Sequence, residues 1–323
     1  MKAPELPVDE PQRLQQLRAL NLLHTPAEER FDRLTRLARR LFNAPVALVS
    51  LLEEDHQWFK SAAGYAAQTA PRNTSFCGHA ILQDDVMVVE NALEDERFHD
   101  NPLVNNELPV RFYAGCPLRT PSGAKVGTLC IIDHQPRHFD SEDYTTLRDL
   151  AAMAESELTA FQTATSDELT RITNRRGFMT LGQLLLNECL VKHQPACLTF
   201  LDLDKFKQIN DTLGHKEGDH ALIDFADAMK VSFRNGDLFA RLGGDEFVVL
   251  FHGLHLDDAH RVLLRFDDYL QQHTESLHRQ YMLHFSSGVV EFDPLHPLSL
   301  EQLLEGSDAR MYAAKREKHQ TRQ

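Results

Sequence analysis

Arg241-Leu242-Gly243-Gly244-Asp245-Glu246-Phe247-Val248-Val249-Leu250 sets two adjacent glycines and two adjacent carboxylates between apolar runs at 238–240 and 247–251. Both flanks are typical of strands, and Gly-Gly accepts positive φ at little cost, so the segment predicts a β-hairpin. An isolated turn of this kind is most simply a loop with solvated acids at its tip. The glycines also leave room for a ligand beside the backbone, and the two carboxylates could hold a divalent cation.

The length and charge of the chain narrow the classes of function. Its 323 residues are enough for two domains with separate cores. Apolar residues make up 42% and charged residues 25%, as in folded globular proteins. The net charge of −14 argues against binding to nucleic acid or to an anionic membrane surface. An anionic nucleotide would need local lysines or metal ions to offset this charge.

Targeting and cysteine patterns favour a cytoplasmic protein. No signal peptide opens the sequence, and no apolar run approaches the length of a membrane span. The five cysteines are odd in number and include no C-x-x-C pair. Reduced thiols are therefore expected rather than disulfides or a zinc site.

The first half alternates helical and strand-like patterns. Apolar residues recur at helical spacing within 14–20 and 31–41, and Thr25 before Pro26 indicates the start of the second helix. Strand-like runs follow at 44–52, 57–62, 85–89, 114–118 and 125–133. With a long closing helix, this order resembles a GAF domain, a cytoplasmic small-molecule sensor. The phrases that carry the resemblance are Asp-His-Gln-Trp-Phe-Lys-Ser at 55–61, Ser-Phe-Cys-Gly-His-Ala-Ile at 75–81, Arg-Phe-Tyr-Ala-Gly-Cys-Pro-Leu at 111–118 and Gly-Thr-Leu-Cys-Ile-Ile-Asp at 127–133.

The ligand of this half is not evident from its residues. Cys77 beside His79 could be a reactive thiol, a chromophore attachment point or a metal ligand. A buried small residue next to a hydrogen-bonded histidine is the favoured interpretation. Some GAF proteins reduce free methionine sulfoxide, but the second cysteine that they need is not evident upstream of Cys116. We therefore expect an unknown small-molecule ligand.

The second half contains further acidic motifs. Residues 167–178 read Asp-Glu-Leu-Thr-Arg-Ile-Thr-Asn-Arg-Arg-Gly-Phe, and a charged turn at 174–176 is expected to precede a helix over 178–191. An apolar strand at 196–203 leads into Asp-Leu-Asp-Lys-Phe-Lys-Gln-Ile-Asn-Asp at 202–211. Asp202 ends a buried strand, where a carboxylate is costly unless it is paired or bound to metal. The strand period of two places Asp202 and Asp204 on one side.

These segments, with the hairpin and Ser-Asp-Ala-Arg-Met-Tyr-Ala-Ala-Lys at 307–315, resemble the diguanylate cyclases, a family named for Gly-Gly-Asp-Glu-Phe. A short helix ends at Gly214 and another is expected to start at Asp219, with a strand at 281–292 and a helix at 298–318. This order resembles the antiparallel cyclase and polymerase-palm fold. We predict an α+β protein with two domains, each a mainly antiparallel sheet with flanking helices. The predicted parts are a segment at 1–24, the sensor at 25–140, a connecting helix at 141–166 and the cyclase at 167–323.

The resemblance implies a metal site and a reaction. Asp202, Asp245 and the Leu203 carbonyl would bind two Mg²⁺ ions, with Mn²⁺ as a possible substitute. Asp245 or Glu246 would accept a proton, and the sequence does not choose between them. The implied reaction condenses two GTP molecules into cyclic di-GMP and two pyrophosphates. Because each site would hold one GTP and the reaction joins two, the resemblance implies a homodimer.

Other positions correspond to the family's nucleotide contacts. Asn210 and Asp219 are expected to read the guanine edge. The other expected substrate contacts are Phe206, Lys207, His215, Gly243, Gly244 and Lys315. His319 stands where the family has a phosphate-binding arginine.

An Arg-x-x-Asp pair, Arg234 and Asp237, lies just upstream of the hairpin. Its position resembles the site at which cyclic di-GMP inhibits the cyclases, although the isolated pattern is usually a surface ion pair. The alternative function is a catalytically weak or inactive receptor that binds cyclic di-GMP. Another nucleotide cyclase or a hybrid dinucleotide synthase is disfavoured by Asn210 and Asp219 together.

The connecting helix has two interpretations. Its apolar residues alternate at spacings of four and three, which is the seam of a short coiled coil. A helix packed on its own domain would show the same stripe. The dimer that the reaction requires favours the coiled coil. The stripe consists of Leu147, Ala151, Ala154, Leu158 and Phe161.

Overall fold

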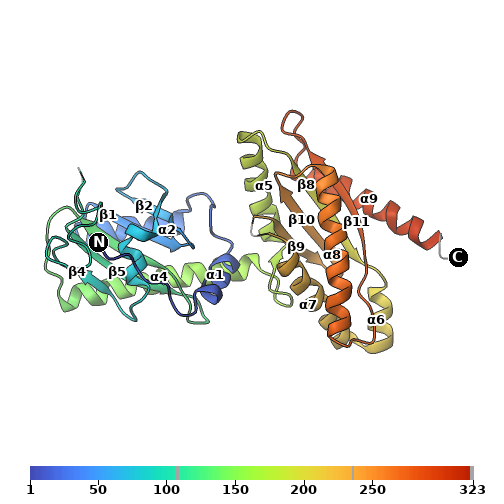
Figure 1. Ribbon diagram of the computed structural model, residues 1–323, viewed down its shortest axis with the longest axis horizontal. Coiled ribbons are helices and arrows are strands. Elements are labelled where there is room, and N and C mark those ends of the chain that lie inside the picture. The colour runs from blue at the N-terminus through green and yellow to red at the C-terminus, as the bar shows by residue number, and fades with distance from the viewer. Residues whose placement is uncertain (107–108, 235, 321–323) are drawn as a thin grey trace. The chain divides into compact units, whose positions relative to one another are not determined.

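The computed structural model describes residues 1–106, 109–234 and 236–320, without the side chains of 318–320. It divides into two compact units, Met1–Gln162 and Thr163–Gln323, each with its own sheet (Figure 1). The predicted α+β class, with a mainly antiparallel sheet and flanking helices in each domain, is confirmed. Within the described ranges, no helix is both long and apolar enough to cross a membrane.

The first unit is built on a six-stranded antiparallel sheet in the order β3-β2-β1-β6-β5-β4. Its strands are β1 (Val46–Leu52), β2 (His56–Ala63), β3 (Thr69–Pro71), β4 (Met87–Val89), β5 (Phe112–Arg119) and β6 (Lys125–Asp133). Its helices are α1 (Glu10–Ala19), α2 (Glu29–Leu41), the 3-10 turn η1 (Arg72–Thr74), α3 (Phe76–Ala80) and α4 (Ser141–Thr165), which continues into the second unit.

Both faces of this sheet are covered, which explains the continuous apolar run in β1. Ala47, Val49 and Leu51 pack in one core with α1, α2 and α4. Val46, Leu48 and Leu52 of the same strand pack in a second core with α3. Because every β1 residue is buried, this strand anchors the unit.

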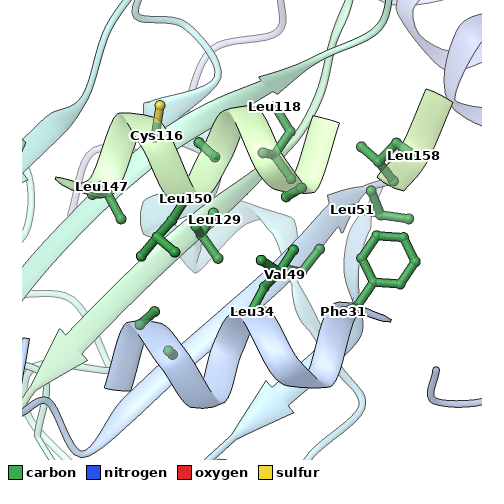
Figure 2. Close-up of a cluster of buried hydrophobic side chains, with 14 of the residues drawn as sticks. Phe31, Leu34, Val49, Leu51, Cys116, Leu118, Leu129, Leu147, Leu150 and Leu158 are labelled. Carbon is green, nitrogen blue, oxygen red and sulfur yellow. The ribbon is translucent and has the colours of Figure 1, made fainter. Parts of the chain in front are cut away.

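The apolar stripe of α4 packs within its own unit. Leu147 and Leu158 lie in the same core as Leu34 of α2, and Figure 2 shows Leu147 and Leu34 directed into the space between the two helices. All five residues of the predicted seam are buried there, with 7% exposure at most. The coiled-coil interpretation of this stripe is therefore wrong. The helix covers a sheet whose apolar face would otherwise be exposed.

The second unit has a five-stranded sheet in the order β11-β8-β10-β9-β7. Its strands are β7 (Thr173–Asn174), β8 (Ala196–Leu203), β9 (Leu238–Gly243), β10 (Glu246–His252) and β11 (Phe285–Phe292), and only the short β7 pairs in parallel among those described. Its helices are α5 (Arg175–Val191), α6 (Phe206–Leu213), α7 (His215–Ser232), α8 (Leu256–Ser276) and α9 (Leu300–Gln320). Helices α7 and α8 pack in one core, and α5 and α9 pack in the other.

Several predicted boundaries were wrong by a few residues. Helix α2 begins at Glu29 rather than at a Thr25 cap, because the Thr25 hydroxyl donates to the Leu22 carbonyl at 2.6 Å. Helix α5 begins at Arg175, because the Asn174 side chain caps it by accepting from Gly177 N at 2.8 Å. Helix α7 begins at His215 and not at Asp219. Strand β11 begins at Phe285, four residues later than predicted, and α9 begins at Leu300.

Candidate active site

The Gly-Gly-Asp-Glu segment forms the turn between β9 and β10, as predicted for a hairpin. Gly244 has φ 52° and Gly243 has φ 153°, conformations that favour glycine. A Cβ at either position would meet nothing within 4 Å. The backbone conformation therefore requires these glycines, and the space beside them is open.

Strand pairing brings two acidic segments of the chain together. Strand β10 lies antiparallel to β8, so that Glu246 stands opposite Asp202. Leu203 N donates to the Asp245 carbonyl at 3.2 Å. Asp202, Leu203, Asp245 and Glu246 therefore meet at one edge of the sheet.

Alternation along the strands directs two of these acids to the same face. Leu198 and Phe200 of β8 pack against α5 and α9, and Asp202 continues that series two residues on. Glu246 precedes Val248 and Leu250, which belong to the same core. The acids consequently lie at the rim of the α5–α9 face.

The electrostatics of this edge suit a cation. Burial raises the pKa of Asp202, a hydrogen bond from Lys315 opposes that rise, and the Asp245 carboxylate adds to it. Burial also raises the pKa of Glu246. The negative charges of Asp308, Asp245 and Asp202 raise it further. Carboxylates crowded in this way repel one another. A divalent cation with oxygen ligands would relieve the repulsion.

Lys315 is already engaged at this edge. Its ammonium group forms an ion pair with Asp202, and the Lys315 side chain is 28% exposed. Nearby, Ser286 Oγ donates to Asp204 Oδ1 at 2.6 Å. Lys315 is thus placed where it can neutralise either Asp202 or an incoming phosphate.

Five of the residues expected to bind the nucleotide lie on two consecutive helices, α6 and α7. Asn210 is half-buried on α6, and Asp219 is exposed in the first turns of α7. A Cβ on Gly218 would overlap the Asn210 amide. Gly218 therefore makes the space that Asn210 occupies. On the same two helices, Phe206 is half-buried, while Lys207 and His215 are exposed.

One contact of the hairpin was not predicted from the sequence. Arg241 Nη1 donates to both Asp167 oxygens at 3.1 and 3.2 Å, and Arg241 Nε donates to the Gly244 carbonyl at 2.9 Å. Asp167 follows the end of α4 by two residues. Although burial raises the pKa of Asp167, hydrogen bonds from Thr170 and the charge of Arg241 hold it below its usual value. The Gly-Gly turn is thereby tied to the segment after α4. The sequence held a signal for this contact, because Arg241 and Asp167 both lie in motifs quoted in the sequence analysis.

Arg234 and Asp237, the pair expected to bind the product, lie together and form an ion pair with each other. Arg234 Nε donates to Asp237 Oδ1 at 3.0 Å, and the guanidinium also contacts the His252 carbonyl. The Asp237 side chain is only 3% exposed, and burial raises its pKa. A ligand would have to compete with this ion pair for Arg234. The side chain of His319 lies outside the described residues.

Cys77 of the first unit has a neighbour that the sequence did not reveal. Cys77 Sγ lies 3.8 Å from Cys130 Sγ, and both thiols are buried. His79 Nε2 is 3.0 Å from the Lys2 carbonyl. The interpretation of Cys77 as a buried residue near a hydrogen-bonded histidine agrees with these contacts.

Two domain families match the chain. The family described as diguanylate cyclase, GGDEF domain, matches residues 164–321, and the GAF domain family matches residues 26–158. These matches confirm the order of families expected from the motifs.

Individual relatives match parts of the chain. A cyclic di-GMP phosphodiesterase of Pseudomonas aeruginosa is 39% identical over 177 residues, or 54% of this chain, and the chain spans only 30% of that protein. The diguanylate cyclase DgcP of Escherichia coli is 28% identical over 238 residues, which is 68% of each protein. The crystal structure of the diguanylate cyclase SiaD of Pseudomonas aeruginosa with its activator SiaC is 31% identical. It covers 54% of this chain and 66% of SiaD, with a TM-score of 0.46.

Proposed function

We propose that this chain, in which residues 26–158 match the GAF domain family and residues 164–321 match the GGDEF domain family, is a diguanylate cyclase. The reaction would condense two GTP molecules into cyclic di-GMP and two pyrophosphates. The observation that carries this proposal is the meeting of Asp202, Asp245 and Glu246 beside an open glycine turn. The proposed parts are the segment 1–24, the sensor 25–140, the connecting helix 141–166 and the cyclase 167–323, in the cytoplasm.

The acidic edge would hold the metal ions. Asp202, Asp245 and the Leu203 carbonyl supply the oxygen ligands that Mg²⁺ prefers, and Mn²⁺ could replace it. Bound divalent ions would supply charge neutralisation for the triphosphate and a lowered pKa for the attacking hydroxyl. Lys315 would then pair with a phosphate oxygen instead of Asp202, because the Asp202 carboxylate would bind the metal.

Glu246 is our proposed proton acceptor, with Asp245 as a metal ligand. Its pKa is raised by burial and by its acidic neighbours. A carboxylate with a raised pKa holds a proton more readily near neutral pH than an ordinary one. The side chain is half-buried, and strand alternation places it on the same face as Asp202.

The nucleotide would lie between the hairpin and the α6–α7 pair. Asn210 and Asp219 would complement the donors and acceptor of the guanine edge. The other proposed substrate contacts are Phe206, Lys207, His215, Gly243, Gly244 and Lys315. The exposed lysine and the open turn leave room for a triphosphate in an otherwise acidic protein.

Regulation would act at two places. Each active site holds one GTP, so two catalytic domains of a homodimer would have to meet. A small-molecule ligand of the GAF domain would act through α4, whose end is followed by the Asp167–Arg241 contact to the hairpin. Cyclic di-GMP would bind Arg234 and Asp237 after displacing their ion pair. If Arg234→Ala leaves product inhibition unchanged, this assignment of the inhibitory site is wrong.

The decisive experiment incubates the purified chain with GTP and Mg²⁺ and separates the products chromatographically. We expect cyclic di-GMP and pyrophosphate from the parent protein and neither from Asp245→Ala. A parallel incubation with cyclic di-GMP tests hydrolysis, the activity named in the Pseudomonas relative. Binding of cyclic di-GMP without any turnover, across several candidate GAF ligands, would instead identify the chain as a receptor.

A further inference from the structure

We propose that His24, Glu53 and His56 of the GAF domain bind a divalent transition-metal ion of the Zn²⁺ type. Their ligand atoms lie within 4.8 Å of one another. The inference is independent of the proposed cyclase activity, because these residues belong to the first unit and the acidic edge belongs to the second.

The distances between the ligand atoms suit such an ion. Glu53 Oε1 lies 3.1 Å from His24 Nε2 and 3.0 Å from His56 Nε2. Bonds of about 2.0–2.1 Å in a tetrahedral zinc site separate neighbouring ligand atoms by about 3.3 Å. A small adjustment of the side chains would therefore admit a metal ion.

The backbone holds all three ligands in place. Glu53 directly follows β1, and His56 is the first residue of β2. Glu53 N donates to the His56 carbonyl at 2.9 Å and closes this turn. His24 comes from the loop between α1 and α2, where its φ of 57° is left-handed. Its neighbour Thr25 is buried and accepts from Lys60 Nζ at 2.6 Å, which anchors the loop.

The Glu53 carboxylate lies at the centre of this cluster, between the two imidazoles. Glu53 Oε1 is buried and lies within ion-pair distance of both imidazoles. A buried anionic oxygen is costly unless it is hydrogen-bonded or bound to a cation. A metal ion would bind this oxygen and the Nε2 atoms of both imidazoles together.

The surroundings of His56 favour metal binding. Asp55 Oδ1 lies 2.5 Å from His56 Nδ1. A carboxylate at Nδ1 fixes the proton there and leaves the Nε2 lone pair for a metal. The His24 side chain is 56% exposed, so the site is open to solvent on one side. Three protein ligands and a water would complete a four-coordinate site that exchanges its metal.

The chemistry of the ligands selects the metal. Imidazole nitrogens suit Zn²⁺, Ni²⁺, Co²⁺ and Fe²⁺, whereas Mg²⁺ prefers an all-oxygen shell. Binding would join the α1–α2 loop to the β1–β2 turn. It should therefore raise the thermal stability of the GAF domain, since metal bound to the folded state alone stabilises that state.

The test uses the full-length chain freed of metal by a chelator and then dialysed. Calorimetric titration with Zn²⁺ should show one site that is at least tenfold tighter than any other. Co²⁺ in its place should produce visible absorption bands of a low-symmetry site. His24→Ala and His56→Ala should each weaken this site at least tenfold, and Asp55→Asn should weaken it by about tenfold.

His138→Ala is the matched control. His138 is exposed in the same unit and pairs with Glu90 at 2.8 Å. Like the proposed ligands it is a histidine paired with a carboxylate, but it does not belong to the cluster of three ligand atoms. This variant should bind Zn²⁺ like the parent. Circular dichroism checks that each variant is folded. The proposal is overturned if the parent chain shows no tight site and no Co²⁺ bands, or if His24→Ala/His56→Ala binds Zn²⁺ as tightly as His138→Ala does.

Discussion

Gly218 illustrates how one missing side chain can shape a binding site. The Asn210 amide occupies the space where a Cβ of residue 218 would stand. Replacement by alanine must therefore move Asn210, although both residues lie on well-formed helices. The glycine matters here for space and not for backbone freedom.

We expect Gly218→Ala to raise the KM for GTP about tenfold or more, because displacing a positioning group by about 1 Å can cost up to a hundredfold in rate. Steady-state kinetics would measure the change. In an Asn210→Ala background the same substitution should have little further effect, since the overlap is gone. Additive losses in the double variant would show that Gly218 acts in another way.

The acids of the acidic edge were identified from the sequence, and the pairing of β8 with β10 brings them together. Asp202 was identified because a carboxylate stood at the end of a buried strand, and Asp245 because it followed two glycines. Their roles as metal ligands stay predictions. The pairing of Lys315 with Asp202 and the contribution of Asp308 to the charge around Glu246 required the packing of α9.

At the scale of elements, the hairpin is fastened to the segment that follows α4. Arg241 reaches both Asp167 and the carbonyl of Gly244. We expect Arg241→Ala to lower cyclic di-GMP synthesis about tenfold, by releasing the turn, while costing only about 1 kcal/mol of stability for a partly exposed ion pair. Product formation and thermal unfolding would be measured together.

The control for that substitution is Arg261→Ala. Arg261 forms an exposed ion pair with Asp258 on α8, so its loss removes a comparable charge without touching the hairpin. Synthesis should be unchanged in this variant. Equal losses in the two variants would point to net charge as the cause and would contradict a specific link to the hairpin.

Helix α1 is held by a buried ion triad. Glu10 accepts from Arg13 Nε at 2.7 Å and from Arg72 Nη1 at 2.5 Å. Glu10→Gln should destabilise the first unit by about 3–5 kcal/mol, because it leaves two guanidinium groups buried without their counter-charge. Chemical denaturation would measure the loss. Glu29→Gln, which breaks the exposed Glu29–Arg36 pair, should leave the transition unchanged.

The same triad predicts a pH dependence. Burial raises the pKa of Glu10, but hydrogen bonds and charges from Arg13 and Arg72 outweigh it and hold the pKa below its usual value. A carboxyl with a depressed folded-state pKa contributes stability above its unfolded pKa and loses it as the pH falls through the folded value. The difference in stability between the parent and Glu10→Gln should therefore shrink below about pH 4. A constant difference down to pH 2 would contradict this account.

At the scale of the whole molecule, the proposed reaction needs two copies of a chain whose predicted dimer seam lies in its own core. Any dimer must use other surfaces. Because each site would hold one GTP, specific activity should rise with protein concentration until the dimer is saturated. Activity from nanomolar to micromolar chain, beside molar mass by light scattering, tests this. Constant specific activity from a monomer would exclude the two-chain reaction.

Local chemistry was enough to predict the two sheets, the hairpin and the acids at the strand end, because glycine conformation, strand alternation and apolar runs act over a few residues. It did not distinguish a coiled-coil seam from a helix packed on its own domain, since the stripe of α4 is the same in both. It also missed the contacts Arg241–Asp167, Cys77–Cys130 and His24–Glu53–His56. These pairs are far apart in sequence or depend on a left-handed loop, and only the packing of whole elements brings their side chains together.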